Sequence, residues 1–486
     1  MPSLITGAVL EYQDDIVQRT HVPRTPGEVT ATEPRTGARS RCLTPTGHTR
    51  VTGRRAARAV RARAQAWGGR LLARRLSRKG IDLASLTFIP APAKVPLQRI
   101  GTDPVPRLAE LRATDPVHRI ELPFDFSVYL VTDTEQVRAV LANRDDYSND
   151  IRHLLPGTGG TTSGSDIGGL GFTDAPLHTR LRKIITPEFT MRRLARLEPM
   201  IEAIVESQLD ELAAAGADGT PVDLAKALSF PVPFQTICAL LGLELSDRDA
   251  FARLGVQRFD ITSGAAAAFG AVSEQREFLF DAVARQRREP GPGLIGQIIR
   301  DEGDAISDVD LAGLADGVFT GGYETTAGMI SLSTLVLLRD PAHAELVRSG
   351  TRKDVDRVVE ELLRYLSVVQ MAFPRFARHD MDLMGTPLKA GDVVLASLSG
   401  ANRDPLSAGD SPEAFDPARV PTSGHLAFGH GAHRCIGAEL ARMELRILLP
   451  ALLRRFPDLA VAVPQSELRF RELSFVYGID ELPVTV

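Results

Sequence analysis

The chain has 486 residues, of which 43% are hydrophobic and 24% are charged, and its formal net charge is −4. This composition is ordinary for a globular protein, and no apolar run approaches the roughly 20 residues that a membrane-spanning helix needs. The three cysteines, Cys42, Cys238 and Cys435, are too few and too scattered for a disulfide framework or an iron–sulfur cluster. No G-x-G-x-x-G motif follows a predicted strand, as it would in a dinucleotide-binding fold.

The first 85 residues differ from the rest of the chain in charge. Residues 1–80 contain 16 Lys and Arg against 5 Asp and Glu, and prolines stand among Thr, Gly and Arg as in a disordered tail. Residues 54–78 have the Arg, Ala and Leu pattern of a basic helix, without the apolar core of a secretory signal. A surface for anionic lipid, nucleic acid or an acidic partner is one interpretation. We favour the simpler one, that residues 1–85 form a basic, partly disordered extension.

Residues 117–149 predict a strand pair followed by a helix. Apolar and polar residues alternate around Tyr129–Val131 and then take helical spacing. The segment from Gly157 to Gly171 that follows is rich in Gly, Ser and Thr. Loops of that length usually carry function or lack a fixed structure.

Another helix is expected to begin at Asp174 and Pro176. His178 and Arg182 are four residues apart and therefore lie on one face of it. An isolated pair of this kind is usually a surface feature. From Val222 to about Arg300 the pattern is helical and names no ligand.

The longest predicted helix begins at Ser307 and ends at Asp340–Pro341, where proline stops it. Ser307 and Asp310 resemble a capping box. About 32 residues in a helix would span about 48 Å, enough to cross a whole domain.

The middle of this helix contains two residues that disfavour a helix. Gly321 and Gly322 are adjacent, and each costs about 1 kcal/mol relative to alanine in a helix interior. This indicates that something approaches the backbone closely there. Glu324 and Thr325 follow, an acid and a hydroxyl. On its own, the stretch would be a kinked core helix with a solvated glutamate.

Two further stretches carry charged residues at fixed spacing. Glu361 and Arg364 lie three residues apart on an amphipathic helix, a common arrangement for a surface ion pair. Phe415 to Arg419 follows downstream with the sequence FDPAR.

Phe428 to Gly437, reading FGHGAHRCIG, is the most informative stretch of the chain. Cys435 stands at the end of a glycine turn, and a helical pattern begins directly after it. Backbone N–H groups and the macrodipole at a helix N-terminus favour an anion such as a thiolate. Glycine at Gly429 and Gly431 permits close approach of a flat ligand. A buried structural cysteine is the plainer interpretation of such a residue alone.

Taken together, these motifs resemble the cytochrome P450 family. The spacing FxxGxxxCxG is similar to its haem-binding motif, and cysteine thiolate is a known axial ligand of haem. The resemblance covers roughly residues 95–486 and implies one catalytic domain over residues 86–486. The implied fold is mainly α with a small β region, a triangular prism in which haem is buried between a long central helix and the Cys-ligand loop.

The resemblance also implies roles for individual residues. Cys435 is the metal ligand of haem b, and Glu324 with Thr325 is the acid–alcohol pair that delivers protons during dioxygen reduction. Glu361, Arg364 and Arg419 form a buried structural triad. Further haem contacts are implied at His178, Arg182, Arg375, Phe428, His433 and Gly437. The substrate pocket is implied to include Gly321, Val368, Val369, Met371, Phe475 and Val476, and the helices over Pro231 to about Gln275 to cover it.

The implied function is insertion of one atom of dioxygen into a small, apolar molecule by hydroxylation or epoxidation. The resemblance to bacterial members implies a cytoplasmic enzyme without a transmembrane anchor and without a nucleic-acid partner. Its electrons come from a ferredoxin and a ferredoxin reductase. A basic docking face is expected from Arg180, Lys183, Arg192, Arg193, Arg434 and Arg442.

Two alternatives stay open. One is a thiolate-haem enzyme of another reaction class, such as a peroxygenase or an oxidative coupling catalyst. The intact Glu324–Thr325 pair argues against direct use of peroxide, because that route needs no proton relay. The other is a haem sensor without enzymatic activity, which we rank low because no output domain is recognisable. The substrate, the oligomeric state and the role of residues 1–85 do not follow from the sequence.

Overall fold

The computed structural model describes residues 91–486 except 116, 121–126, 151–169, 244–264 and 421–422. The predicted extension of residues 1–85 and most of the segment Gly157–Gly171 lie outside the described residues. Residues 244–264, which fall within the helices expected over Pro231 to about Gln275, also lie outside the described part. No helix in the described ranges is both long enough and apolar enough to cross a membrane.

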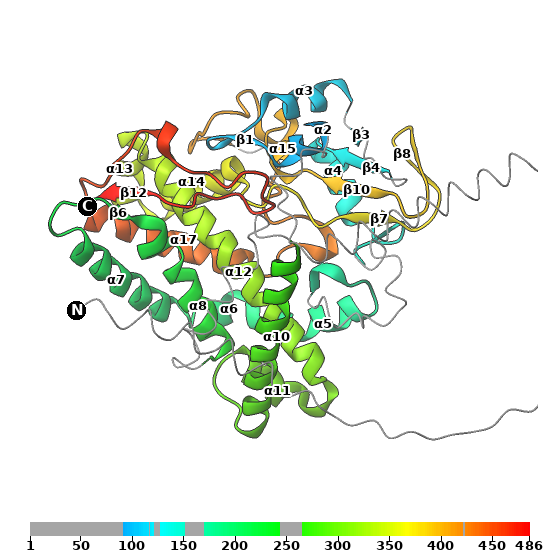
Figure 1. Cartoon of the computed structure of the whole chain (residues 1–486), viewed down its shortest axis with the longest axis horizontal. Helices are drawn as coiled ribbons and strands as arrows, with labels where there is room; N and C mark the ends of the chain where they lie inside the picture. The colour runs from blue at the N-terminus through cyan, green and yellow to red at the C-terminus, as the bar shows by residue number, and fades with distance from the viewer. Residues whose placement is uncertain (1–90, 116, 121–126, 151–169, 244–264, 421–422) are drawn as a thin grey trace, which may run out of the picture. The chain divides into compact units, whose positions relative to one another are not determined.

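Helices make up most of the described chain (Figure 1). Those longer than two turns are α3 (Pro106–Thr114), α4 (Thr134–Ala142), α5 (Leu177–Ile185), α7 (Glu198–Ala215), α8 (Pro231–Leu241), α10 (Ala265–Arg288), α11 (Leu294–Glu302), α12 (Asp308–Leu337), α13 (Pro341–Ser349), α14 (Arg352–Leu366) and α17 (Ala438–Arg455). The shorter ones are α2 (Ala91–Lys94), α6 (Met191–Leu194), α15 (Leu398–Ala401) and α16 (Pro405–Ala408).

The helix predicted from Ser307 is confirmed as α12. Ser307 caps it by accepting a hydrogen bond from the Asp310 backbone N–H at 3.1 Å. In a full capping box the Asp310 carboxylate would also accept a hydrogen bond from the Ser307 backbone N–H. Here that carboxylate pairs with Arg180 of α5 instead. In Figure 1, α12 runs through the middle of the described chain, and it contacts α8, α10, α14 and α17.

One glycine of α12 explains how closely it packs on α8. A Cβ added at Gly322 would come within 2.5 Å of the Ile237 side chain, so a larger residue would require that side chain of α8 to shift. The free energy lost by placing glycine in a helix is thus offset by close helix packing. The helix stays continuous through Gly321 and Gly322.

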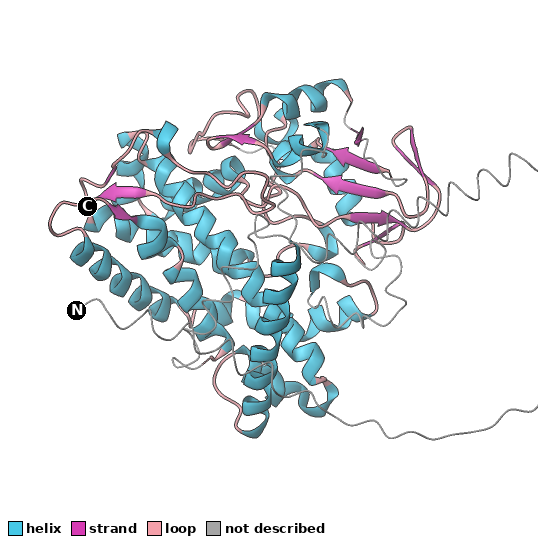
Figure 2. Ribbon diagram, viewed as in Figure 1, coloured by secondary structure: helices cyan, strands magenta, loops and turns pink. Residues whose placement is uncertain are grey.

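The strands form small sheets (Figure 2). The largest has the order β3-β4-β10-β7-β5, in which β10 runs parallel to β4 and the other pairs are antiparallel. Its strands are β3 (Val117–Ile120), β4 (Val128–Val131), β10 (Val393–Ala396), β7 (Arg375–Ala377) and β5 (Tyr147–Ser148). The remaining strands are β1 (Arg99–Ile100), β2 (Asp103–Pro104), β6 (Val222–Asp223), β8 (Met381–Leu383), β9 (Thr386–Leu388), β11 (Ala460–Val461) and β12 (Pro483–Thr485).

The buried apolar residues form separate clusters in the helical part and around the five-stranded sheet. The largest apolar cluster is formed by α7, α8, α12, α14 and α17, with buried residues such as Leu209, Ile330 and Leu448. A second cluster lies between the five-stranded sheet and α4, around Val131 and Val137. The expectation of a mainly helical fold with a small β region is therefore confirmed, and so is the predicted strand pair and helix of residues 117–149.

Candidate active site

The loop that carries Cys435 ends at the start of α17. Gly431–His433 form one 3-10 turn, and the Cys435 backbone N–H donates to the Phe428 carbonyl oxygen at 2.9 Å. Gly437 is the N-cap of α17. The predicted turn and helix start at the cysteine are both present.

The thiol of Cys435 is both exposed and surrounded by protein. Its side chain is accessible, whereas burial raises the pKa of the thiol above its ordinary value. The Gly437 backbone N–H and the charges of Arg182 and Arg434 oppose this rise without cancelling it. The sulfur is thus accessible although protein surrounds much of it.

The glycines around this sulfur differ in what they allow. Gly431 has φ of 72°, and a Cβ there would lie 2.5 Å from the Leu141 carbonyl oxygen, so this glycine permits the loop to pack on α4. Gly429 has φ of 68°, and a Cβ there would meet no atom within 4 Å. Gly321 on α12 is equally open. Gly429 and Gly321 therefore leave their backbones accessible to a ligand.

Four nitrogen-bearing side chains gather near the cysteine. The rings of His178 and His433 lie 4.0 Å apart between centroids. His433 Nδ1 lies 3.1 Å from the Leu170 carbonyl oxygen. The charge of Arg375 acts on His433, and those of Arg182 and Cys435 act on each other. The structure thus brings together residues from α5, β7 and the cysteine loop.

Burial dominates the electrostatics of this cluster. It lowers the pKa of His433 to about 3, with further lowering by His178 and Arg375. It lowers the pKa of His178 as well, and that of Arg375 to about 10. A negatively charged ligand beside these buried nitrogen groups would favour their protonated, positively charged forms. The cluster is therefore suited to an anionic ligand.

Asp174 is the carboxylate whose charge acts on His178, His433 and Arg375, and it already has hydrogen-bond partners of its own. Asp174 accepts hydrogen bonds from Ser148 Oγ, from the Asn149 backbone at 2.9 Å and from Arg378 at 2.8 Å. Burial opposes its ionisation, yet these bonds hold the pKa of Asp174 below its ordinary value. The helix start predicted from Asp174 and Pro176 is confirmed, since α5 begins at Leu177, and the Asp174 carboxylate in addition ties this start to β5 and to the end of β7.

The donor set fits haem. His178 is buried, and its Nε2 has no hydrogen-bond partner among the described residues. Arg182 has no ion-pair partner there either. Two propionate carboxylates would satisfy such donors, the open glycines would accept a flat ring, and the Cys435 sulfur is accessible from the same loop.

The predicted acid–alcohol pair is divided in the structure. Thr325 Oγ1 donates to the Gly321 carbonyl oxygen of its own helix at 2.7 Å. The buried Glu324 carboxylate forms an ion pair with Arg471, which also holds Asp480 at 2.9 Å. The two side chains therefore have separate partners. Sequence reasoning missed Arg471, and no local spacing could have found it 147 positions from Glu324.

The predicted structural triad is assembled. Arg364 donates to both carboxylate oxygens of Glu361 at 2.8 Å, and Arg419 Nε lies 3.1 Å from the same carboxylate. Arg364 also donates to the carbonyl oxygens of Asn402 and Pro412, each at 2.8 Å. Glu361 and Arg364 are fully buried, so this is an internal network and not a surface ion pair.

Apart from Gly321 on α12, the predicted pocket residues come from two segments that lie side by side. Val369 and Val476 form an isolated antiparallel bridge. Val368 and Val476 are buried, whereas Phe475 is 49% exposed. Met371 packs in an apolar cluster against the five-stranded sheet. The contribution of each side chain to a substrate pocket remains a prediction.

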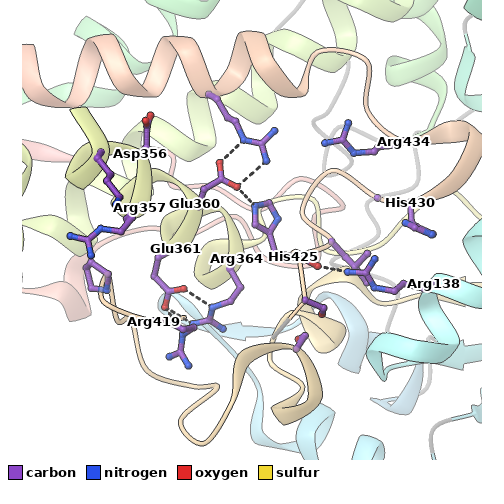
Figure 3. A pocket seen from close by; sticks show the side chains of 18 residues that line it. Arg138, Asp356, Arg357, Glu360, Glu361, Arg364, Arg419, His425, His430 and Arg434 are labelled. Atoms are coloured by element: carbon purple, nitrogen blue, oxygen red, sulfur yellow. Dashed lines mark hydrogen bonds and ion pairs between the residues drawn. The ribbon is translucent and has the colours of Figure 1, made fainter. Parts of the chain in front are cut away.

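A pocket of about 500 Å³ lies beside the cysteine loop (Figure 3). Its lining includes Glu360, His425, Arg442, Arg138 and Arg434. Arg442 was expected to be free for docking a partner. Only 13% of its side chain is exposed, because Glu360 and Glu439 bind it.

Two other members of the expected docking face also have partners. Arg180 pairs with Asp310, and Arg193 pairs with Glu188 at 2.9 Å. Lys183, Arg192 and Arg434 are exposed. Arg434 has no ion-pair partner among the described residues, which leaves it as the docking candidate nearest to Cys435 in the chain.

The chain is similar to known proteins over most of its described length. The model of the family described as Cytochrome P450 matches residues 293–467. Cytochrome P450 165C4 of Amycolatopsis orientalis is 39% identical over 393 residues, which cover 80% of this chain and 95% of that relative. The monooxygenase PikC of Streptomyces venezuelae is 38% identical, with 80% and 92% coverage.

Solved structures agree with these relatives. OxyC, described as implicated in an oxidative C–C coupling reaction during vancomycin biosynthesis, has a TM-score of 0.72 and 37% identity. The match covers 82% of this chain and 97% of that one. Mycinamicin VIII C21 methyl hydroxylase of Micromonospora griseorubida has a TM-score of 0.72 at 32% identity, covering 79% and 98%.

Proposed function

The chain belongs to the cytochrome P450 family of haem-thiolate monooxygenases, and on this premise we propose that it hydroxylates or epoxidises a small, apolar molecule at a haem held by Cys435. The observation that carries this proposal is the accessible Cys435 sulfur beside four buried or half-buried nitrogen donors. A coordinated metal deprotonates a thiol outright, which would overcome the raised pKa of Cys435.

We assign the binding of the cofactor to the residues of this cluster. Haem with a thiolate ligand activates dioxygen for transfer of one oxygen atom to an organic substrate. His178, Arg182, Arg375 and His433 would hold its propionates, and Phe428 and Gly437 would shape the loop around the thiolate. Of these, His178 offers the strongest support, because its buried Nε2 lacks a partner among the described residues.

Glu324 and Thr325 are our candidates for proton delivery. Thr325 would hold a proton donor at the open backbone of Gly321, to which its hydroxyl is already bonded. Glu324 would exchange protons with solvent, and Arg471 is its ion-pair partner in the arrangement seen here. The substrate would lie near Val368, Val369 and Phe475.

Electrons would come from a ferredoxin and its reductase. This finer assignment rests on the resemblance to bacterial members of the family and on the exposed Arg434 beside the cysteine, which has no ion-pair partner in the part of the chain that the structure describes. The cytoplasmic location predicted from the sequence stays a prediction.

Oxidative coupling is the second candidate, favoured by the neighbour described as a C–C coupling enzyme. Isotope labelling separates the two. Incorporation of one atom of ¹⁸O from ¹⁸O₂ into the product indicates insertion, whereas a product that has lost two hydrogens and carries no label indicates coupling.

The first experiment is an absorption spectrum of the reduced protein with carbon monoxide. We expect the strongly red-shifted Soret band of a thiolate ligand, and we expect Cys435→Ala to lose it while Cys238→Ala keeps it. Cys238 is buried in the helical core, which makes it the matched control. A histidine-type band in the unmodified protein would refute the assignment of Cys435.

A further inference from the structure

The pocket beside the cysteine loop is bordered by an ion-pair network that the proposed function does not use. Glu360 of α14 accepts hydrogen bonds from Nε and Nη2 of Arg442 of α17, the second at 2.9 Å. His425 Nε2 lies 3.1 Å from the same carboxylate, and Glu439 holds Arg442 Nη1 at 2.8 Å. Two helices and the segment before the loop therefore meet at Glu360, which Figure 3 shows directed at His425.

The hydrogen bonds of this network favour the ionised form of Glu360 and indicate which ring nitrogen of His425 donates. Burial opposes ionisation of Glu360, but the hydrogen bonds from His425 and Arg442 and the charge of Arg442 hold its pKa at about 2. The Ala427 backbone N–H donates to His425 Nδ1 at 3.2 Å, so the proton of His425 is on Nε2 and is donated to Glu360. A paired arginine and carboxylate with two parallel bonds has a specific geometry.

The network is in contact with Phe428, the first residue of the cysteine loop. The centre of the Arg442 guanidinium lies 4.7 Å from the centroid of the Phe428 ring, a cation–π distance. The ring of His425 lies 5.9 Å from the same ring. Phe428 in turn accepts the hydrogen bond from the Cys435 backbone N–H at 2.9 Å. Displacement of Phe428 would therefore move Cys435.

We propose that Glu360 and His425 are positioning residues for the axial ligand: they hold Arg442 over Phe428, and Phe428 fixes the backbone of Cys435. The inference rests on the proposed role of Cys435 as ligand. In this proposal Arg442 has a structural role and does not dock a partner. Three consecutive contacts, Glu360 with Arg442, Arg442 with Phe428 and Phe428 with Cys435, connect the wall of the pocket to the thiolate.

The test uses haem-loaded protein and three variants. Glu360→Gln removes the charge that holds Arg442, and His425→Ala removes the second contact to Glu360 while leaving the ion pair. Asp356→Asn is the matched control, because Asp356 pairs with Arg446 at 3.4 Å across the same two helices, one turn earlier on α14. The readouts are the midpoint potential and the rate at which the thiolate-type Soret band of the reduced carbon monoxide complex is lost in mild urea.

We expect Glu360→Gln to speed this loss by roughly two- to thirty-fold, the range that one cation–π contact represents. His425→Ala should have a smaller effect in the same direction, and Asp356→Asn none. If Glu360→Gln fails to fold, His425→Ala decides by the same criterion. Wild-type rates and potentials in both variants would overturn the inference, and so would an equal effect of Asp356→Asn. A wild-type protein without a thiolate-type band would instead remove the assignment of Cys435.

Discussion

At the scale of single residues, the acid with the most unusual surroundings is Glu444 on α17. Its side chain is 1% exposed, and its Oε2 has no hydrogen-bond partner among the described residues. Burial raises its pKa to about 8. Burial thus favours the protonated form of Glu444 at neutral pH in the folded protein.

This predicts a pH dependence of stability. In the unfolded chain Glu444 releases its proton near pH 4.5, and in the folded chain near pH 8. Between these values the folded state binds more protons, so the free energy of unfolding should fall as pH rises, by at most about 1.4 kcal/mol per unit. Glu444→Gln should remove this slope, measured from urea midpoints between pH 5 and 7. Exposed Glu467→Gln serves as control, and parallel pH profiles of all three proteins would contradict the prediction.

The residues that could be predicted from sequence share one property, a fixed local spacing. Cys435 with its glycines, and Glu361 with Arg364, lie within a few positions of one another, so their motif determines their geometry. The distant contact of Glu361 with Arg419 was expected only from the family resemblance. The contacts of Glu324 with Arg471 and of His425 with Glu360 were not predicted, because they form only where separate elements pack together. Burial then alters their chemistry, as it does for Cys435.

At the scale of elements, Arg364 joins α14 to the long segment after β10. Its guanidinium donates to Glu361 and to carbonyl oxygens of Asn402, Pro412 and Ala414. Glu361 also accepts from the Asp416 backbone at 2.9 Å. The segment lacks regular structure at these carbonyl groups, and the arginine takes the place of a strand partner for them.

Arg364→Lys should therefore destabilise the protein although it keeps the charge. A lysine cannot make the bidentate bond and reach the three carbonyl oxygens, and disruption of a buried pair costs about 3–5 kcal/mol when one partner is removed. We expect a large fall in the thermal midpoint and in the haem content of the soluble fraction. Arg357→Lys, on the same helix but 50% exposed, should change neither. Similar midpoints for the two variants would show that the triad has no special role.

Element boundaries agreed with prediction where a local pattern determined them. The strands and helix of residues 117–149 and the start of α12 followed local pattern and capping. The start of α5 at Leu177 also follows the predicted signal of Asp174 and Pro176, but the partners of the Asp174 carboxylate, Ser148, Asn149 and Arg378, could not be read from that signal.

At the scale of the whole molecule, the exposed charges near Cys435 determine how a redox partner would approach. Arg442 is unsuitable for testing this, since reversing its charge would break the contacts with Glu360 and Phe428. Arg434 lines the same pocket, is exposed and is one residue from the proposed ligand (Figure 3). Its charge can therefore be changed without breaking an ion pair among the described residues.

Arg434→Glu should slow electron transfer from an acidic ferredoxin roughly tenfold at low ionic strength, because complementary charges accelerate encounter. The difference should shrink at 0.5 M salt, where the Debye length is only about 4 Å and charges are screened. The control is Arg455→Glu, at the far end of α17 and about 25 Å from its start at 1.5 Å per residue. Stopped-flow reduction under carbon monoxide measures both rates. If Arg434→Glu and Arg455→Glu slow transfer equally, net charge alone governs the encounter, and the ferredoxin approaches by a face other than the one beside Cys435.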